Sequence, residues 1–222
     1  MENKRNAVIT GATSGLGFEL MNALPDDGWN VAVCGRRKNL IDEIRKRQDR
    51  RILAEVCDIR VEQSIVLFLK KVERELGEID LLVLNAATIG PLPLRRLEEL
   101  KLEDLRWTFE TNFFGNFNFM KHSLPLLREY SLIIHITSDA ATVPYPGWGP
   151  YSSSKAAFDM LIKILNEELR DRHISAFSFD PGDMDTEMHR SALPEDRSPL
   201  KDPKVAASDL VQEIRRRSAV HE

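Results

Sequence analysis

The chain has 222 residues, of which 42% are hydrophobic and 30% charged, and its formal net charge is −4. This length suits a single domain, and this composition is typical of a globular protein rather than a disordered or fibrous one. The small acidic excess argues against binding to nucleic acid or to an anionic membrane, and no apolar run approaches the ~18 residues of a membrane span.

Short apolar segments rich in β-branched residues alternate with longer segments of helical periodicity. Continuous apolar strands are typical of a parallel sheet that is covered by helices on both faces. The fold class is therefore α/β, a single doubly wound domain over residues 1–222 with a parallel sheet. The Rossmann-type order 3-2-1-4-5-6 is the usual one for such a sheet, and we expect it here. The six expected strands are Ala7–Thr10, Val31–Cys34, Ile52–Cys57, Leu81–Leu84, Leu132–Thr137 and Ile174–Phe179.

Helical spacing of apolar residues predicts the connecting elements. One helix contains Leu40, Ile41 and Ile44, and the others are expected over Phe18–Leu24, Val61–Leu76, Lys101–Arg128, Tyr151–Arg172 and Val205–Arg217. The stretch 183–203 has no such periodicity. A loop of this length in a compact domain is commonly a lid, so we expect it to cover a substrate.

A glycine-rich turn joins the first strand to the first helix. Glycines at such a turn let the backbone approach a pyrophosphate closely, and the helix N-terminus offers free N–H donors. The alternative is a plain strand-to-helix turn without a ligand. The segment predicted to bind a dinucleotide comprises Gly11, Thr13, Ser14, Gly15, Leu16 and Gly17.

The second strand ends in Cys34-Gly35-Arg36-Arg37, without the acidic residue that usually selects NAD(H). A guanidinium can bind a 2′-phosphate through charge-assisted hydrogen bonds, whereas a carboxylate would repel it. Arg36 and Arg37 therefore favour NADP(H), with NAD(H) still possible. The alternative is an arginine that merely projects into solvent at the start of a helix.

Tyr151 and Lys155 are four residues apart, so their side chains share one helix face. A neighbouring cation stabilises phenolate and lowers the pKa of a tyrosine from about 10 towards the range useful for acid–base catalysis. Ser138 stands at the end of the fifth strand, where its hydroxyl could bind the same substrate oxygen as the phenol. An ordinary surface pair is the alternative interpretation of the tyrosine and lysine.

Taken together, these segments resemble the short-chain dehydrogenase/reductase family from Lys4 to about Arg217. The matching segments also include Asp58, Asn85-Ala86-Ala87, Asn112 within Thr111–Gly115, and Pro181-Gly182 with Thr186. Each motif alone is weak, whereas their order and spacing together are specific.

The resemblance implies a role for each of these residues. Tyr151 would be the general acid/base, Ser138 would hold the substrate carbonyl, and Lys155 would bind the nicotinamide ribose. Asn112 would support a water that relays protons to Lys155, although a helix-interior polar group bonded to its own backbone is the alternative. The remaining cofactor contacts would be Asp58 to the adenine amine, Ile59 on the ring, Asn85, Ala86 and Ala87 along the cofactor, and Pro181, Gly182 and Thr186 near the carboxamide.

By the resemblance, most relatives follow the last helix with a seventh strand and a Thr-Gly…Asp-Gly-Gly-type segment, which we do not expect in this chain. The sixth strand would then have an unpaired edge. By the resemblance we expect a homodimer through helices 101–128 and 151–172, and we expect tetramers built across a seventh strand to be disfavoured.

The expected substrate is an uncharged aldehyde, ketone or secondary alcohol of modest size. Candidate pocket residues are mostly apolar or aromatic, although Tyr145 and Trp148 could equally be core or dimer contacts. They are Thr88, Ile89, Ala140, Tyr145, Trp148, Met184 and Met188. The main alternative is a cofactor-sensing protein without turnover, and a sugar-nucleotide epimerase is disfavoured because too little chain remains for a substrate domain.

The N-terminus shows no secretory signal pattern, so we expect a cytoplasmic protein in which Cys34 and Cys57 are reduced. No group of His, Cys, Asp and Glu has the spacing of metal ligands, so no metal is expected.

Overall fold

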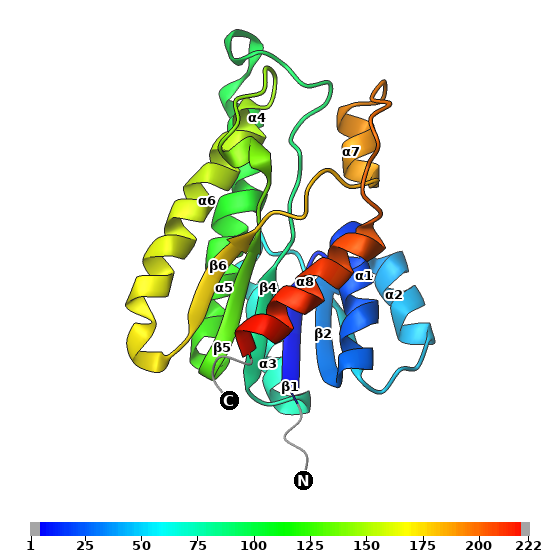
Figure 1. Cartoon of the computed structure of the whole chain (residues 1–222), viewed down its shortest axis with the longest axis vertical. Helices are drawn as coiled ribbons and strands as arrows, with labels where there is room; N and C mark the ends of the chain where they lie inside the picture. The colour runs from blue at the N-terminus through cyan, green and yellow to red at the C-terminus, as the bar shows by residue number, and fades with distance from the viewer. Residues whose placement is uncertain (1–4, 219–222) are drawn as a thin grey trace.

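A computed structural model describes residues 5–218, so the start of the resemblance at Lys4 lies outside the described residues. Its centre is a six-stranded parallel sheet with the order β3-β2-β1-β4-β5-β6, which confirms the predicted fold class (Figure 1). The strands are β1 Arg5–Thr10, β2 Trp29–Gly35, β3 Ile52–Val56, β4 Ile79–Leu84, β5 Leu127–Ile136 and β6 Ser175–Phe179.

Helices cover both faces of this sheet in three layers (Figure 1). On one face lie α1 (Gly15–Ala23), α2 (Lys38–Lys46) and α8 (Pro203–Ser218). On the other lie α3 (Glu62–Glu75), α5 (Asn116–Ser123) and α6 (Gly149–Glu168), with α4 (Leu102–Phe109) beside α6. The short α7 (Glu187–Ala192) stands above α1 and α2 in this view.

The double cover explains why the strands lack hydrophobic alternation. Val8 and Ile9 are neighbours on β1 and point to opposite faces, yet both are fully buried because each face is packed by helices. The thiols of Cys34 and Cys57 are likewise buried and free.

The expected helix over Lys101–Arg128 is wrong as a single element. The chain forms α4, then a π-helical segment over Glu110–Gly115, then α5, and a 3-10 turn over Leu124–Leu126 ends this helical run. Pro125 lies in that turn and cannot donate a helical hydrogen bond, so β5 starts at Leu127 and Arg128 lies in a strand.

Other boundaries differ by smaller amounts. The first helix begins at Gly15 rather than Phe18, and α6 spans Gly149–Glu168, with a separate 3-10 turn over Arg170–Arg172. The stretch 183–203 is not a plain loop, because it contains α7 and a bridge between Met184 and Lys201. The last helix is present as α8.

The outer edge of β6 has no neighbouring strand among residues 5–218. Helix α8 crosses the sheet face rather than this edge, and its Arg217 guanidinium lies 3.7 Å from the ring centre of Phe177 on β6. Within the same range, no helix is both long and apolar enough to cross a membrane.

Candidate active site

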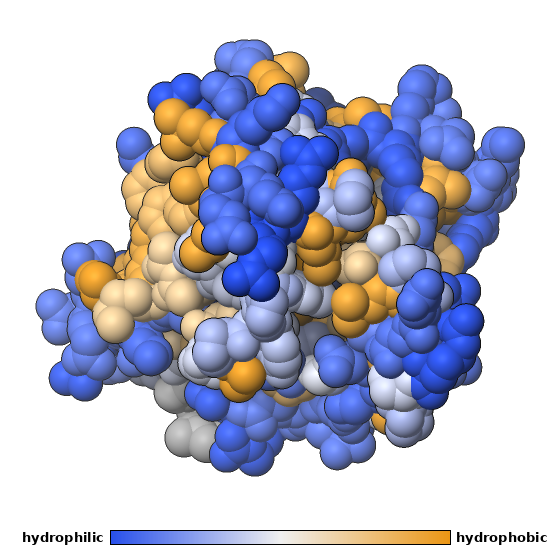
Figure 2. All heavy atoms as spheres, turned by 90° about the horizontal axis from the view of Figure 1, so that it is seen from above, coloured by the Kyte–Doolittle hydropathy of each residue, from blue (hydrophilic) through white to orange (hydrophobic). Residues whose placement is uncertain are grey.

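A cleft of about 790 Å³ opens at the carboxyl ends of the strands. Figure 2 looks onto this end of the molecule and shows apolar side chains exposed among hydrophilic ones. Most residues predicted for cofactor and catalysis line this cleft. They are Gly11, Thr13, Ser14, Gly15, Leu16, Arg36, Arg37, Ile59, Asn85, Ala86, Ala87, Ser138, Tyr151, Lys155, Pro181, Gly182 and Thr186.

Three predicted residues do not line it: Gly17, Asp58 and Asn112. The carboxylate of Asp58 is bound by Arg60, with a shortest contact of 2.7 Å. The hydrogen bond from Arg60 lowers the pKa of Asp58 despite partial burial, which by itself raises it. The predicted contact between Asp58 and adenine stays a prediction.

The glycine turn is held against β4 by a tight packing contact. Gly11 has φ +70°, and a Cβ placed there would lie 2.7 Å from the Cα of Ala86. The Asn85 amide donates to the carbonyl oxygens of Thr10 and Gly11 at 2.9 and 3.0 Å. Asn85 therefore fixes the position of the turn, and only a glycine fits at position 11.

This turn fits the phosphates of a dinucleotide. Helix α1 begins at Gly15, its N-cap Ser14 makes no side-chain capping bond, and no acidic residue occupies the first turn. The helix N-terminus therefore keeps free N–H donors and its positive dipole end at the cleft. Arg37 lies beside it and donates to Thr13 Oγ1 at 2.9 Å and to Ser14 Oγ at 2.5 Å.

The two arginines after β2 have different environments. Arg37 also forms an ion pair of 3.1 Å with Glu187, the first residue of α7. Arg36 is exposed and lines the cleft. Arg36 is therefore accessible from the cleft, while Arg37 ties the glycine turn to α7.

Tyr151 and Lys155 lie in the first half of α6 and face the cleft from its inner wall. Their exposed fractions are 8% and 2%. The Lys155 Nζ donates to the carbonyl oxygen of Ile136 at 2.5 Å and lies 5.7 Å from the centre of the Tyr151 ring. The structure thus brings the predicted pair together, with the ammonium bound to the end of β5.

The pKa directions of this pair reflect burial. Burial raises the pKa of Tyr151 to about 12, which outweighs a hydrogen bond with Ser138 that lowers it. Burial also lowers the pKa of Lys155 to about 8, against the charges of Asp159 and Asp180, which raise it. The direction for the tyrosine is opposite to the one expected from the sequence, because desolvation of the phenolate dominates.

Ser138 lies two residues after the end of β5 and belongs to a small polar network. Its Oγ accepts from the N–H of Ala140 at 3.2 Å and donates to Asp139 Oδ1 at 3.0 Å. The Tyr145 hydroxyl donates to Asp139 Oδ2 at 2.5 Å, and this bond lowers the pKa of Asp139. Sequence reasoning missed Asp139, although its place beside Ser138 was a usable signal.

Asn112 is fully buried in the π-helical segment, and its side chain does not bond its own helix backbone. It accepts from the N–H of Thr88 at 2.8 Å and donates to the Thr88 carbonyl at 2.9 Å and to Ser154 Oγ at 3.0 Å. These contacts join the segment after β4 to α6. The role of Asn112 in proton relay stays a prediction.

Asn116 was missed, although it stands one helical turn after Asn112. Its amide donates to the carbonyl oxygens of Ala86, Thr111 and Asn112 at 2.9, 3.2 and 3.1 Å. It therefore holds the segment after β4, which lines the cleft, against the π-helical segment.

All seven candidate pocket residues line the cleft, including Tyr145 and Trp148. Thr186, expected near the carboxamide, accepts from the N–H of His189 and caps α7. Four further carboxylates missed by the sequence analysis also line the cleft: Asp180, Asp183, Glu187 and Asp196. Residues 5–218 contain no group of His, Cys, Asp and Glu suited to a metal ion.

A family model for short chain dehydrogenases matches residues 5–197. The chain belongs to the short-chain dehydrogenase family. As a member it is an oxidoreductase on a Rossmann-type fold.

Individual relatives agree with this assignment. The chain is 31% identical over 178 residues to a "Probable NADP-dependent dehydrogenase" of Haemophilus influenzae, covering 79% of this chain and 70% of the relative. It is 30% identical over 190 residues to the 2,3-dihydro-2,3-dihydroxybenzoate dehydrogenase of Bacillus subtilis, covering 83% and 72%. Among solved structures, the alcohol dehydrogenase of Thermococcus sibiricus with 5-hydroxy-NADP aligns with a TM-score of 0.83 at 27% identity, covering 96% and 91%.

Replacement of Gly11 by alanine tests the packing of the turn. We expect Gly11→Ala to abolish nucleotide binding and to lower the free energy of unfolding, because the new Cβ would overlap Ala86. Gly28→Ala is the matched control, since Gly28 also has positive φ but a Cβ there meets nothing within 4 Å. Denaturant unfolding should show Gly11→Ala about 1–3 kcal/mol less stable than this control. Equal stability of the two variants would contradict the close contact.

Proposed function

We propose that the protein is an NADP(H)-dependent oxidoreductase that transfers a hydride between nicotinamide and a small aldehyde, ketone or secondary alcohol. One observation carries the proposal. A single cleft is lined by the glycine turn, where the N-terminus of α1 has no side-chain cap, and by the buried pair Tyr151 and Lys155. A dinucleotide seated on the turn would run along the strand ends towards this pair.

The residues of the chain supply the proton chemistry. When bound, a nicotinamide cofactor supplies or accepts a hydride. Tyr151 keeps its proton at neutral pH, so its phenol can donate it to the carbonyl oxygen during reduction. Ser138 would bind the same oxygen, and the Lys155 cation would stabilise the phenolate left behind.

Four observations support the preference for NADP(H). Arg36 is exposed at the cleft mouth, and the residue before it is a glycine rather than an acid. The relative from Haemophilus influenzae is named as NADP-dependent, and the Thermococcus sibiricus structure holds 5-hydroxy-NADP. NAD(H) binding stays possible.

The substrate side of the cleft favours an uncharged compound. Asp139, Asp180 and Asp183 line the cleft, and all three raise the pKa of Tyr151 in addition to the effect of burial. Their negative field would repel a substrate carboxylate or phosphate. Trp148, which packs edge-on against the Tyr151 ring at 5.7 Å, adds an apolar wall.

The stretch 183–203 is our proposed lid. The cytoplasmic location also stays a prediction. Helix α7 lies within this stretch, and its Glu187 is joined to Arg37 beside the glycine turn. Closure of this segment over a bound nucleotide would exclude water from the reacting atoms.

Replacement of Tyr151 by phenylalanine separates an enzyme from a cofactor sensor. We expect Tyr151→Phe to lower kcat for NADPH-dependent reduction of small aldehydes at least about 100-fold, because the proton donor is lost. Cofactor affinity, measured by NADPH fluorescence, should change little. Unchanged turnover would refute the role of Tyr151, and absence of turnover in the unmodified protein with intact NADPH binding would favour the sensor.

Replacement of Arg36 tests the cofactor preference. We expect Arg36→Ala to raise the Kd of NADPH about 10- to 100-fold through loss of a charged hydrogen bond, with the Kd of NADH unchanged. Lys38→Ala is the control, because Lys38 is a neighbouring cation that pairs with Asp42 and does not line the cleft. A parallel loss for NADH would show that Arg36 does not bind the 2′-phosphate.

We also propose a homodimer through the faces of α4, the π-helical segment and α6. Large apolar side chains with exposed fractions of 41–57% gather on these elements, which a partner would cover. They are Leu102, Trp107, Phe114, Met160 and Ile164.

Sedimentation tests this surface. We expect the unmodified protein to sediment as a dimer and the double variant Met160→Lys/Ile164→Lys as a monomer, because two buried charges would oppose association. Leu67→Lys on α3, where the side chain is 59% exposed, should leave the dimer intact. A stable tetramer would contradict the proposed homodimer, because it requires a second interface.

A further inference from the structure

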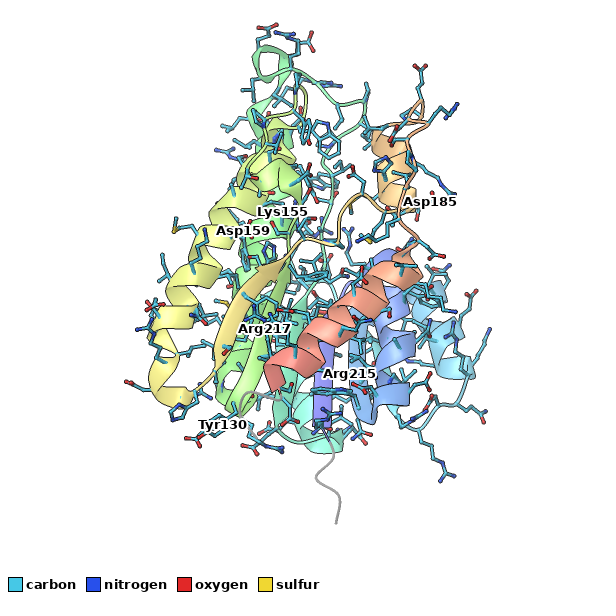
Figure 3. All side chains as sticks on the ribbon, in the orientation of Figure 1. Tyr130, Lys155, Asp159, Asp185, Arg215 and Arg217 are labelled. Carbon is cyan, nitrogen blue, oxygen red and sulfur yellow. The ribbon has the colours of Figure 1, made fainter. Side chains whose placement is uncertain are left out.

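A third polar residue continues the row formed by Tyr151 and Lys155 on α6. Asp159 follows Lys155 by four residues, so it lies one turn further along the same helix face, as Figure 3 shows for the labelled pair. This face packs against β5 and β6, and the Asp159 side chain is only 17% exposed. A carboxylate in such a place needs partners that stabilise its charge.

Three side chains from the sheet supply these partners. His135 Nδ1 lies 3.0 Å and Ser178 Oγ 2.6 Å from Asp159 Oδ1, and Thr137 Oγ1 donates to Oδ2 at 2.7 Å. His135 and Ser178 are register partners on adjacent strands, and Thr137 follows two residues after His135, so all three point to the same sheet face. The carboxylate is therefore fixed by two strands at once.

The network leaves Asp159 negative and His135 neutral. Burial raises the pKa of Asp159, but the hydrogen bonds from its three donors prevail and lower it. Burial and the charge of Lys155 lower the pKa of His135 to about 4. Since a carboxylate only accepts, His135 donates through Nδ1, and its Nε2 is buried without a partner.

We infer that Asp159 is a positioning residue for the reaction, whose carboxylate, fixed by its three strand donors, holds Lys155 in the protonated form. The Lys155 ammonium is 2% exposed and donates to a neutral carbonyl, that of Ile136, so it needs a negative charge nearby. The role of Asp159 in turnover rests on the proposed function, whereas its effect on the protonation of Lys155 does not.

None of the other titratable groups that face Lys155 stabilises its positive charge more than Asp159 does. Asp180, after β6, acts in the same direction as Asp159 but contributes less to raising the pKa of Lys155. Tyr151 on α6 keeps its proton up to pH about 12, and His135 on β5 is neutral above pH about 4. Between about pH 6 and about pH 10, the pKa of Lys155 is therefore set by burial, by Asp159 and, to a smaller extent, by Asp180.

The decisive measurement is made on the cofactor-free protein. The ε-carbon of lysine, labelled with ¹³C, is titrated by NMR, and the Lys155 signal is assigned by its loss in Lys155→Arg. In Asp159→Asn we expect the pKa of Lys155 to fall from about 8 by about one unit or more, since an opposite charge has been removed at similar side-chain volume. An unchanged pKa of Lys155 in the folded variant would overturn the inference.

The pH profile of reduction gives a second readout. Lys155 is protonated below its pKa, so kcat/KM should be retained at low pH and lost as the pH rises through about 8. In Asp159→Asn this alkaline limb should move down with the pKa, giving about a fivefold loss at pH 8 and almost none at pH 6, where Lys155 is protonated in most molecules. A loss of equal size at every pH would indicate a merely structural role and would also overturn the inference.

Two control variants test whether the effect comes from the negative charge of Asp159. Glu167→Gln removes another carboxylate of α6, which pairs with Arg170 at the surface, and should leave both readouts unchanged. Asp159→Glu keeps the charge and should restore most of the Lys155 pKa. An equal shift in Glu167→Gln would contradict a specific effect of Asp159.

A second variant covers the case in which Asp159→Asn does not fold. Asp159→Ala combined with Thr137→Val and Ser178→Ala removes two donors together with their acceptor, which limits the number of unpaired buried groups. The same fall in the Lys155 pKa is expected. A fall in the pKa together with no turnover in the unmodified protein would support the Asp159–Lys155 interaction while refuting the proposed function.

Discussion

Burial of a positive charge is the constraint on which the site depends. Lys155 is almost without contact to solvent, and its ammonium rests on a main-chain carbonyl at the end of β5. Desolvating an ammonium costs several kcal/mol unless opposite charges and hydrogen bonds compensate. The parallel sheet provides this compensation, because the end of β5 supplies the carbonyl and the strand side chains fix a carboxylate below it.

Amide side chains of three asparagines hold the backbone that lines the cleft in place. Asn85 joins the end of β4 to the glycine turn, Asn116 holds the backbone after β4, and Asn112 binds the same segment to α6. Loops that lack regular ladders leave backbone groups unpaired, and amide side chains can satisfy both donors and acceptors. The cleft is thus lined by irregular chain that is nevertheless fixed on several sides.

Charge is distributed unevenly along the cleft. Arg36 and Arg37 stand at the glycine turn, whereas Asp139, Asp180 and Asp183 gather near Tyr151. The first end suits an anionic ligand and the second a neutral one, and the two ends lie in the same cleft. The same carboxylates, together with burial, keep the tyrosine protonated, as its proposed role of proton donor requires.

The sequence by itself determined the α/β class and the six strands, because β-branched apolar runs alternated with helical periodicity, and the usual order of this fold class predicted the strand order. It also determined the glycine turn and the spacing of Tyr151 and Lys155, since both are local patterns along the chain. Only the tertiary structure decided the break in the helix around Asn112, the pairing of Asp58 with Arg60 and the direction of the tyrosine pKa. These features depend on burial and on contacts made only in the folded chain. The spacing of residues along the sequence does not predict which side chains come together.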